Sequence, residues 1–415
     1  MTDGRQSTAI SEGTAPATGS PEGAVRVVRG GNGMKVHRLS IARLGAEDLA
    51  SWRELVEAAV EPNPCYEPEF LRPAAAALGP ADMELVIVTE RGRWRALVPV
   101  QRVWRLGRVP APAVATWADP LSFLDTPLIH AGAVEAAVAK VAEEVAGRGS
   151  MLGLVVRRLA DGPVADALTE ALAPARRGVV LESYTRAAAY RSDAPNGDGS
   201  SRTDRKKARR VERSLGPLSV DRRVGDAGSV EEFLALEASG WKGRGGTAMA
   251  SRPAQAEFFR RMARGFAERG ALETVALRAG GELLAMKVNL VAAGVRYHMK
   301  ITYDERYGRF SPGRLLEQLV LEAFREEESL LMMDGCASRA GSVLDDVLSS
   351  RRRIMALLVP SSAAARRLAA PVARRHAERV EREAGERAAR SPAVPDHHDG
   401  PAPTGAGAGR GDPSP

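Results

Sequence analysis

The 415-residue sequence predicts a mixed α/β fold made of two similar domains in tandem. Segments with apolar residues at every second position alternate with segments whose apolar residues follow helical spacing. One hairpin pattern, two apolar runs joined by a glycine turn, occurs near residue 92 and again near residue 281. Both ends of the chain are rich in Gly, Pro and Ala, which is typical of disordered flanks.

Composition limits the class of protein. The only two cysteines, Cys65 and Cys336, form neither a disulfide framework nor a metal-ligand spacing, so we expect a reducing compartment and no metal. The apolar stretches are interrupted by charge, and the first 33 residues contain no signal-peptide core. We therefore expect a cytoplasmic protein without a membrane span, and we find no signal of an oligomeric state.

The net charge of +7 is concentrated in one segment. Residues 202–213 contain seven Arg or Lys and two acidic residues, a local charge of +5. Because one predicted helix accounts for nearly all the excess, the charge distribution disfavours general binding to nucleic acid.

The N-terminal half is predicted to contain a tail and one domain. Residues 1–34 bury too little apolar surface to offset the entropy of ordering and should be disordered. Residues 35–185 should form the first domain. Its expected elements are helices at residues 49–60 and 68–78, a hairpin of residues 85–88 and 94–99 around Gly92, a helix at residues 134–145 and a strand at residues 151–156.

A basic helix is predicted at residues 203–215, after a loop at residues 191–201. Its only apolar positions are Ala208, Val211 and Leu215. Most such helices are solvated faces packed by a narrow apolar stripe. The alternative is that Arg205, Lys206 and Arg209 contact an anionic ligand.

The second predicted domain, residues 186–360, repeats the pattern of the first. Helices at residues 230–239 and 253–269 flank a glycine-rich loop, and a hairpin follows around Gly280 and Gly281, which suit a turn with positive φ. When Gly92 is superposed on Gly281, Ala96 falls on Ala285. This internal match predicts two equivalent hairpins.

A third strand is predicted at residues 295–302, where apolar and polar residues alternate. The inward set should be Val295, Tyr297, Met299 and Ile301, and the outward set Arg296, His298, Lys300 and Thr302. His298 is therefore expected to face away from the core.

The helix at residues 312–327 begins with a possible anion site. Ser311 is a favourable N-cap and Pro312 a favourable first residue, so Gly313 and Arg314 lie where backbone N–H groups lack helical partners. These groups and the positive helix end attract anions, and Gly313 permits close approach. Alternatively, this is an ordinary helix start with Arg314 in solvent. The corresponding residues 127–132 of the first domain have no Arg or Lys, so we expect the ligand in the second domain only.

The succession of three strands, a glycine-containing loop, a helix and a strand resembles the acetyl-CoA-binding half of the GNAT N-acetyltransferase fold. The residues resemble the branch named after cellulose-biosynthesis acetyltransferases (CelD/BcsL type). The similar segments are YDERY at 303–307, SPGRLL at 311–316, EASGWKG at 237–243, RKK at 205–207 and DGCA at 334–337. The resemblance covers roughly residues 35–360 and implies tandem GNAT-like acyl-CoA N-acyltransferase domains. The helix start departs from the usual GNAT loop, because it keeps one glycine only.

The resemblance implies an acyltransferase that uses acetyl-CoA, or another acyl-CoA, to modify an amine or hydroxyl of a sugar or other small polar metabolite, as in polysaccharide biosynthesis. The expected cofactor-binding residues are Met299, Lys300 and Ile301 on the strand edge and Ser311, Pro312, Gly313 and Arg314 at the helix start. The expected acceptor-binding residues are Arg205, Lys206, Trp241 and Lys242. Trp241 has an alternative role, anchoring its loop by burial.

A base must remove a proton from the acceptor. His298 can titrate near neutrality and is the first candidate; Asp334 and Tyr303 or Tyr307 are alternatives. Two other functions remain open. A FemABX-like transferase would use aminoacyl-tRNA as donor and hold RNA on the basic helix, and a degenerate GNAT pair would act as a binding protein.

The last segment, residues 361–415, should be a tail that is helical up to residue 390 and disordered beyond it. Its adjacent His397 and His398 do not make a metal site by themselves.

Overall fold

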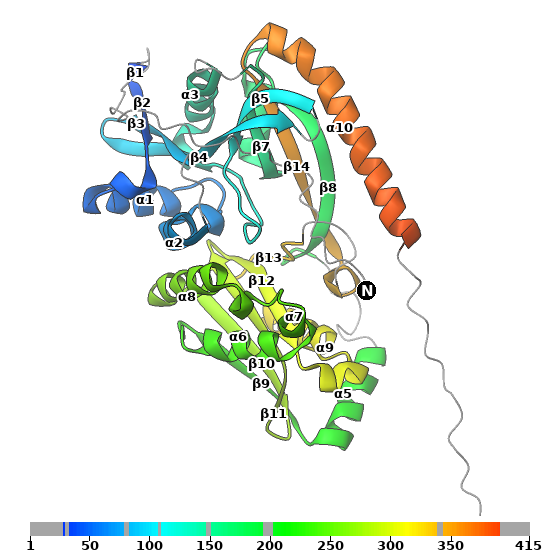
Figure 1. The fold of residues 1–415 in the computed structure, drawn as a ribbon. Coiled ribbons are helices and arrows are strands. Elements are labelled where there is room, and N and C mark those ends of the chain that lie inside the picture. Colours follow the sequence, from blue (N-terminus) through cyan, green and yellow to red (C-terminus); the bar gives the residue numbers. More distant parts are fainter. Residues whose placement is uncertain are drawn as a thin grey trace, which may run out of the picture.

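The computed structural model describes residues 28–29, 33–78, 83–106, 109–146, 151–193, 202–337 and 343–390. In this part of the chain, a single mixed sheet carries helices on both faces, which confirms the predicted mixed α/β class (Figure 1). The disordered N-terminal tail was predicted at residues 1–34, but Val28–Arg29 form β1 and Met34 begins β2, so this part of the prediction is wrong. The rest of the predicted disorder, at residues 1–27, 30–32 and 391–415, lies outside the described residues, as do residues 194–201 of the predicted loop.

The N-terminal half has the order strand, two helices, three strands, helix, strand. Its strands are β1 (Val28–Arg29), β2 (Met34–Leu39), β3 (Glu84–Glu90), β4 (Arg93–Leu106), β5 (Val109–Thr116), β6 (Leu128–Ile129) and β7 (Gly153–Ala160). Its helices are η1 (Ile41–Arg43), α1 (Ala46–Glu57), η2 (Pro64–Tyr66), α2 (Pro68–Leu78), η3 (Ala131–Ala133), α3 (Val134–Ala146), α4 (Pro163–Asp166) and η4 (Ala167–Ala171). The predicted helices and hairpin are present, and the strand predicted at 151–156 lies slightly later.

The second half repeats this order. Its strands are β9 (Leu218–Val224), β10 (Leu272–Ala279), β11 (Glu282–Ala292), β12 (Val295–Tyr303) and β13 (Met332–Asp334). Its helices are α5 (Arg202–Leu215), α6 (Ser229–Ser239), α7 (Trp241–Arg244), η5 (Met249–Ser251), α8 (Pro253–Glu268), η6 (Glu305–Phe310), α9 (Pro312–Glu326) and η7 (Val343–Asp346). In each half one long helix lies between two strands that pair in parallel: α3 between β5 and β7, and α9 between β12 and β13.

The two predicted hairpins are equivalent in detail. Val88 pairs with Ala96 in the first hairpin, and Leu277 pairs with Ala285 in the second. In both hairpins the register shifts directly after that pair, between β3 and β4 and between β10 and β11. A shared bulge at the same aligned position confirms the predicted repeat.

The backbone angles of the hairpin turns explain why glycines in the sequence predicted these turns. Each turn has two successive residues with positive φ, a conformation that matches the twist of the flanking strands. These are Arg91 (51°) and Gly92 (81°), Gly280 (56°) and Gly281 (90°), and Ala293 (44°) and Gly294 (76°).

Two long strands join the halves. β14 (Ser350–Pro360) comes from the end of the folded chain, yet it lies between β7 and β8 (Val179–Tyr190), while β8 also pairs with β13 (Figure 1). The predicted domain ranges, 35–185 and 186–360, remain a prediction; their boundary falls inside β8. Helix α10 (Ala363–Arg390) follows β14 and packs Ala369 and Ala373 against the β8 and β14 surface.

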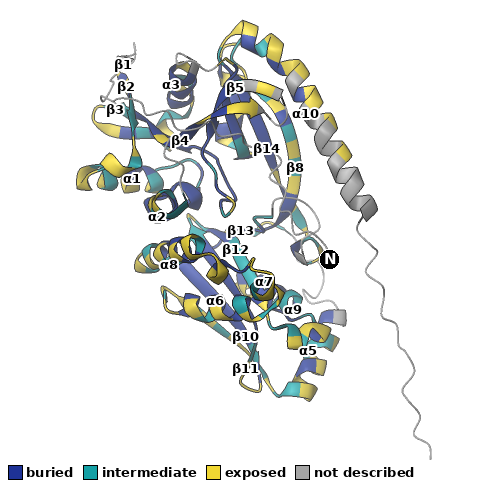
Figure 2. Ribbon diagram, in the orientation of Figure 1, coloured by how far each residue is buried: buried dark blue, intermediate teal, exposed yellow. Residues whose placement is uncertain are grey.

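The core is continuous between the halves. One apolar cluster includes side chains from α1, α2, α6 and α8, and Phe70 of α2 meets Phe258 of α8 edge to face at 5.1 Å. A second cluster lies beneath α9 and α5, where Val211 is buried and Ala208 and Leu215 are partly buried, as the narrow stripe predicted. Figure 2 shows the central strands largely buried. The packing holds the two faces of β12 beneath different helices.

Candidate active site

The pairing of β12 with β13 ends early, and we call the unpaired edge of β12 beyond that point the gap between the two strands. The two strands pair only from Val295 with Met332 to Tyr297 with Asp334. Beyond this point, residues 298–303 of β12 pair with β11 alone, so the other edge of that segment has no strand neighbour among the described residues. A free edge offers N–H and C=O groups to an extended ligand.

A β-bulge at Met299 marks the start of this free edge. Val288 of β11 pairs with Lys300, but the next residue, Asn289, pairs with His298, so Met299 is the extra residue. Tyr297 packs with the cluster beneath α6 and α8. After the bulge, each side chain of β12 lies on the face of the sheet opposite to the one that the predicted alternation gives it.

The exchange corrects the predicted alternation. Ile301 packs with the cluster beneath α9, whereas the side chain of Lys300 reaches Glu237 on α6. A bulge adds one residue to one strand and so reverses which face the following side chains occupy. The side chain predicted to face outward before the bulge, that of Arg296, is not in solvent either. It is buried beneath α9, with its Nε 2.7 Å from Glu273 Oε2.

His298 belongs to a buried polar group beneath α9. Its Nδ1 lies 3.0 Å from Glu317 Oε1, and Glu317 Oε2 lies 2.5 Å from Lys287 Nζ. The side chain of His298 is 13% exposed, so the expectation that it faces away from the core is wrong. Among the described residues its Nε2 has no hydrogen-bond partner, and the contact of Nδ1 with Glu317 has the distance of an ion pair but not the geometry of a hydrogen bond.

The protonation of His298 and Glu317 depends on burial and on the charges of their neighbours in this group. Burial lowers the pKa of His298, which therefore is neutral at neutral pH although Glu317 opposes the shift. Burial alone would raise the pKa of Glu317, but Lys287 and His298 lower it to about 2. A neutral imidazole with a carboxylate at Nδ1 and a free Nε2 is arranged to accept a proton.

The start of α9 lies against the free part of β12. A methyl group added at Gly313 would meet Ile301 and Tyr303 at 3.8 Å, which places the helix start beside the strand. In the described structure, the backbone N–H groups of Gly313 and Arg314 have no hydrogen-bond partner. Ser311 occupies the N-cap position but makes no capping hydrogen bond, because its backbone is left-handed (φ 52°, ψ 53°). The helix end is therefore open to an anion.

Arg314 connects this helix start to the basic helix. Its Nε lies 3.1 Å from Asp204 Oδ1 of α5, and its Nη1 lies 3.4 Å from Asp346 Oδ2. The alternative with Arg314 in solvent is therefore wrong. Arg205 and Lys206 follow Asp204 on α5 and are exposed.

The equivalent helix start in the first half is closed. His130 Nδ1 accepts a hydrogen bond from the N–H of Gly132 at 2.9 Å, so a side chain caps η3 just before α3. The two helix starts therefore differ in capping, and binding of the ligand by the second half only stays a prediction.

The loop after α6 lies close to η6 and to β12. Glu305 of η6 accepts hydrogen bonds from the backbone N–H of Trp241 at 2.5 Å and from Arg244 Nη2 at 2.6 Å. Glu237 Oε1 lies 3.1 Å from Lys242 Nζ and 3.3 Å from Lys300 Nζ. The side chain of Trp241 is exposed, so anchoring of the loop by burial is wrong.

Asp334 and Tyr307 lie in unfavourable places for a base. The carboxylate of Asp334 is fully buried, 2.6 Å from both Arg186 and Arg352, and these guanidiniums lower its pKa although burial alone would raise it. Tyr307 points its hydroxyl at Glu282, 3.3 Å away in the hairpin of β10 and β11. Glu237, Glu305 and Glu317 were not predicted as site residues, although the first two lie in segments that carried the resemblance.

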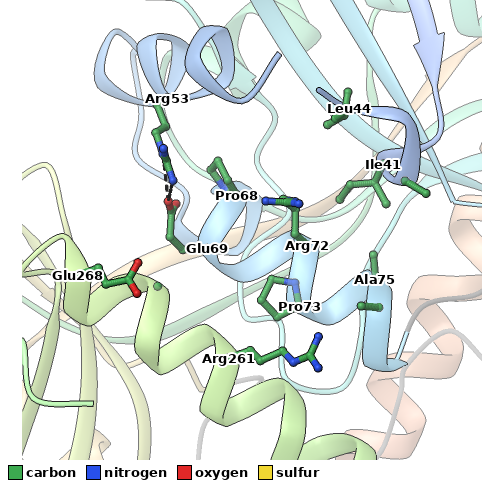
Figure 3. Close-up of a pocket in the computed structure, with 13 residues that line it drawn as sticks. Ile41, Leu44, Arg53, Pro68, Glu69, Arg72, Pro73, Ala75, Arg261 and Glu268 are labelled. Carbon is green, nitrogen blue, oxygen red and sulfur yellow. Dashed lines mark hydrogen bonds and ion pairs between the residues drawn. The ribbon is translucent and has the colours of Figure 1, made fainter. Parts of the chain in front are cut away.

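A cavity of about 500 Å³ lies elsewhere, between η1, α1, α2 and α8 (Figure 3). Arg53 and Glu69 form an ion pair on its wall. None of the candidate residues lines it. Among the described residues no three His, Cys, Asp or Glu side chains form a possible metal cluster, and no described helix has the length and apolar character needed to cross a bilayer.

Comparison with known proteins assigns the second half to a class. Residues 199–337, from the start of α5 to the end of the segment after β13, match the family model described as an acetyltransferase (GNAT) domain. This region contains the open helix start, the bulge and the gap between β12 and β13. Residues 199–337 are therefore similar to a GNAT acetyltransferase domain, and the repeat of these elements in the first half gives a tandem GNAT-like fold.

Solved structures with related folds have low sequence identity. A conserved protein of unknown function from Bacteroides thetaiotaomicron VPI-5482 is 14% identical, with 75% of this chain and 97% of that chain covered and a TM-score of 0.50. FemX is 9% identical, with 78% and 96% covered and a TM-score of 0.48. A tandem GNAT protein from the clavulanic acid biosynthesis pathway is 12% identical, with 79% and 99% covered and a TM-score of 0.42. No curated protein matches this chain.

Proposed function

We propose that this protein transfers an acyl group from an acyl-CoA, most simply acetyl-CoA, to an amine or hydroxyl of a sugar or another small polar metabolite. The observation that carries the proposal is the open start of α9 directly beside the free edge of β12. Binding of a nucleotide thioester needs both features, because its phosphates need N–H donors and its extended arm needs a strand edge.

The residues at this site fit such a donor. The N–H groups of Gly313 and Arg314 and the guanidinium of Arg314 would bind its pyrophosphate, and the free edge from Met299 to Ile301 would pair with its pantetheine arm. When bound, the coenzyme supplies an activated acyl thioester.

His298 is the residue that we propose as general base. Its Nε2 accepts the proton from the acceptor, while Glu317 at Nδ1 orients the ring and stabilises the imidazolium that results. A lowered pKa keeps the imidazole neutral at neutral pH. Asp334 is less suited, because its charge is already neutralised by two guanidiniums.

The acceptor would enter beside α7, where Trp241 is exposed and Lys242 lies next to Lys300. The exposed Arg205 and Lys206 of α5 would contact the phosphates of the donor or an anionic acceptor. We assign the chain to the cellulose-biosynthesis (CelD/BcsL-type) branch, with a role in polysaccharide biosynthesis in the cytoplasm.

Mass spectrometry of the gently purified protein tests the class, since a copurified CoA thioester identifies the donor. Calorimetry with CoA and acetyl-CoA gives the same answer when nothing copurifies. Saturable binding to the wild type and weaker binding to the Arg314→Glu variant are expected. Absence of any CoA binding by the folded protein would leave a degenerate pair as the function, whereas binding of aminoacyl-tRNA without CoA would leave the FemABX-like transferase.

A further inference from the structure

Two lysine amines share one carboxylate oxygen on the side of β12 that faces α6. Lys242 Nζ and Lys300 Nζ lie 3.1 Å and 3.3 Å from Oε1 of Glu237. The other oxygen of Glu237 accepts a hydrogen bond from the N–H of Met249 at 2.8 Å. Both oxygens of this buried carboxylate are therefore occupied.

The positive charge of this group exceeds its negative charge. One carboxylate is enough to neutralise one ammonium group, and the carboxylate of Glu305 in η6, which contacts α7, is engaged by Trp241 and Arg244. Arg252 adds a further positive charge that acts on Lys300. An unneutralised charge in a partly buried place costs free energy unless an anion arrives.

The titration of Lys300 agrees with this excess. Burial lowers the pKa of Lys300, Glu237 opposes the shift, and Lys242 and Arg252 lower the pKa further. An anion bound between the amines would reverse the last two effects.

The position of the pair links it to the acceptor. Lys300 directly follows the bulge at Met299, in the part of β12 that pairs with β11 alone, and its amine reaches Glu237 on α6. Lys242 belongs to the short helix α7, which follows α6. The open start of α9 lies against the opposite face of β12, as Gly313 and Ile301 show. The donor phosphates and the lysine pair thus occupy different sides of the strand.

We propose that the acceptor carries a carboxylate or phosphate group that binds between Lys242 and Lys300. This inference rests on the proposed acyl transfer and narrows its substrate class from polar metabolites to anionic ones. The anion displaces no existing ion pair, because it uses the second charge that Glu237 leaves unneutralised. The rest of the acceptor then extends from the α6 face of β12 past the free edge of the strand at the bulge, toward His298 on the α9 face.

The small number of lysines provides a direct test. The chain contains seven, so protein labelled with ¹³C,¹⁵N-lysine gives few side-chain signals, each assignable by substitution. Inorganic phosphate and acetate are titrated separately at constant ionic strength, with CoA present to occupy the start of α9. The phosphate and acetate arms separate a phosphate-bearing from a carboxylate-bearing acceptor.

We expect saturable shifts of the Lys242 and Lys300 signals with at least one of the two anions, and no comparable change at the exposed Lys35 of β2 in the first half. Lys242→Gln should weaken the response of Lys300 about 10-fold, the effect of losing one charge-assisted hydrogen bond. Arg244→Gln, the same loss of charge two residues away, should leave it unchanged. Unaltered Lys140 and Lys287 signals verify that each variant is folded.

Three results would overturn the inference: no shift beyond a chloride control, an equal response in Lys242→Gln, or shifts of both lysines produced by CoA itself. The last result would assign the pair to the donor. Failure of the proposed acyl transfer is read separately, as absence of CoA binding in calorimetry of the same samples. In that case the anion titration is repeated with Arg314→Glu, in which the start of α9 no longer attracts phosphate.

Discussion

Glu317 Oε1 lies 3.0 Å from His298 Nδ1, and Glu317 belongs to the same helix whose first turn is open to an anion. Gly313 precedes Glu317 by four residues, about one helical turn, so α9 faces β12 with both the candidate anion site and the carboxylate that orients the candidate base. A shift of this helix would change donor binding and base orientation together.

Substitution of His298 tests the base. His298→Ala should lower turnover by about 10²- to 10⁴-fold and leave CoA affinity nearly unchanged, because the side chain acts on the proton and not on the donor phosphates. In the wild type, kcat/KM should rise with pH through a pKa below 6.5 and be level above it, since the neutral imidazole is the active form. Steady-state kinetics with an identified acceptor provide the measurement.

His37→Ala is the matched control. Burial is the main cause of the lowered pKa of His37, as it is for His298, but His37 lies on β2 in the first half. Its turnover should equal that of the wild type. A loss well below 10²-fold in His298→Ala, with the full loss found in Asp334→Asn or Tyr307→Phe, would rule out His298.

The acid limit of stability should depend on Glu317. Its pKa in the folded protein, about 2, lies below the ordinary value of 4.5, so its contribution to the free energy of unfolding is present above pH 4.5 and is lost as the pH falls toward 2. Glu317→Gln leaves Lys287 buried without its partner and should cost about 3 to 5 kcal/mol at pH 7.

Urea denaturation at pH 7 and pH 3 measures both effects. The difference between wild type and variant should shrink at pH 3, since the wild-type carboxylate then loses part of its advantage over the unfolded chain. Glu322→Gln, in the same helix, is the control for the charge change. An equal difference at the two pH values would contradict the assigned role of the buried ion pair.

The sequence predicted local features of this fold well. The glycine turns, the spacing of apolar residues and the alignment of Ala96 with Ala285 depend on neighbours in the chain, and the structure reproduces them. The bulge at Met299 was not predicted, because the apolar and polar alternation continues through it in the sequence while the strand pairing does not. That single added residue separates His298 and Lys300 onto opposite faces.

The contacts that define the site also required the three-dimensional structure. Glu237 meets Lys300, and Asp334 meets Arg186, only because strands and helices distant in sequence are packed together. The return of β14 to a place between β7 and β8 has no local signal either, since strand order is decided by pairing and not by composition. Sequence patterns therefore predicted the strands and the helix start of the candidate site better than the polar contacts around them.

Arg314→Glu should weaken CoA binding by roughly 1 to 3 kcal/mol, the range of a lost charge-assisted hydrogen bond. The new carboxylate would repel the donor phosphates and also Asp204 and Asp346, which now contact the guanidinium. Calorimetry of CoA binding measures the effect. Arg325→Glu, at the opposite end of α9, has the same charge change and should bind CoA as the wild type does. Unchanged affinity in a folded Arg314→Glu protein would remove the helix start as the donor site.

The contact between the two halves should respond to pH through Glu67. This buried carboxyl lies at the end of η2 in the first half and pairs with Arg269 at the end of α8 in the second. Burial raises its pKa to about 7, and Arg269 only partly offsets the shift. The contribution of Glu67 to stability is therefore present below pH 4.5 and is lost as the pH rises through 7.

Glu67→Gln should consequently be less stable than the wild type at pH 5. Between pH 5 and pH 8 its free energy of unfolding should rise relative to that of the wild type by roughly 1 to 3 kcal/mol, since one pKa unit corresponds to about 1.4 kcal/mol. The glutamine keeps the size of the side chain and carries no charge to desolvate. Urea denaturation at both pH values, with Glu57→Gln at the exposed end of α1 as the charge control, gives the comparison. If the stability difference between Glu67→Gln and wild type stays constant between pH 5 and pH 8, Glu67 is ionised throughout, and the ion pair with Arg269 outweighs the burial of its carboxylate.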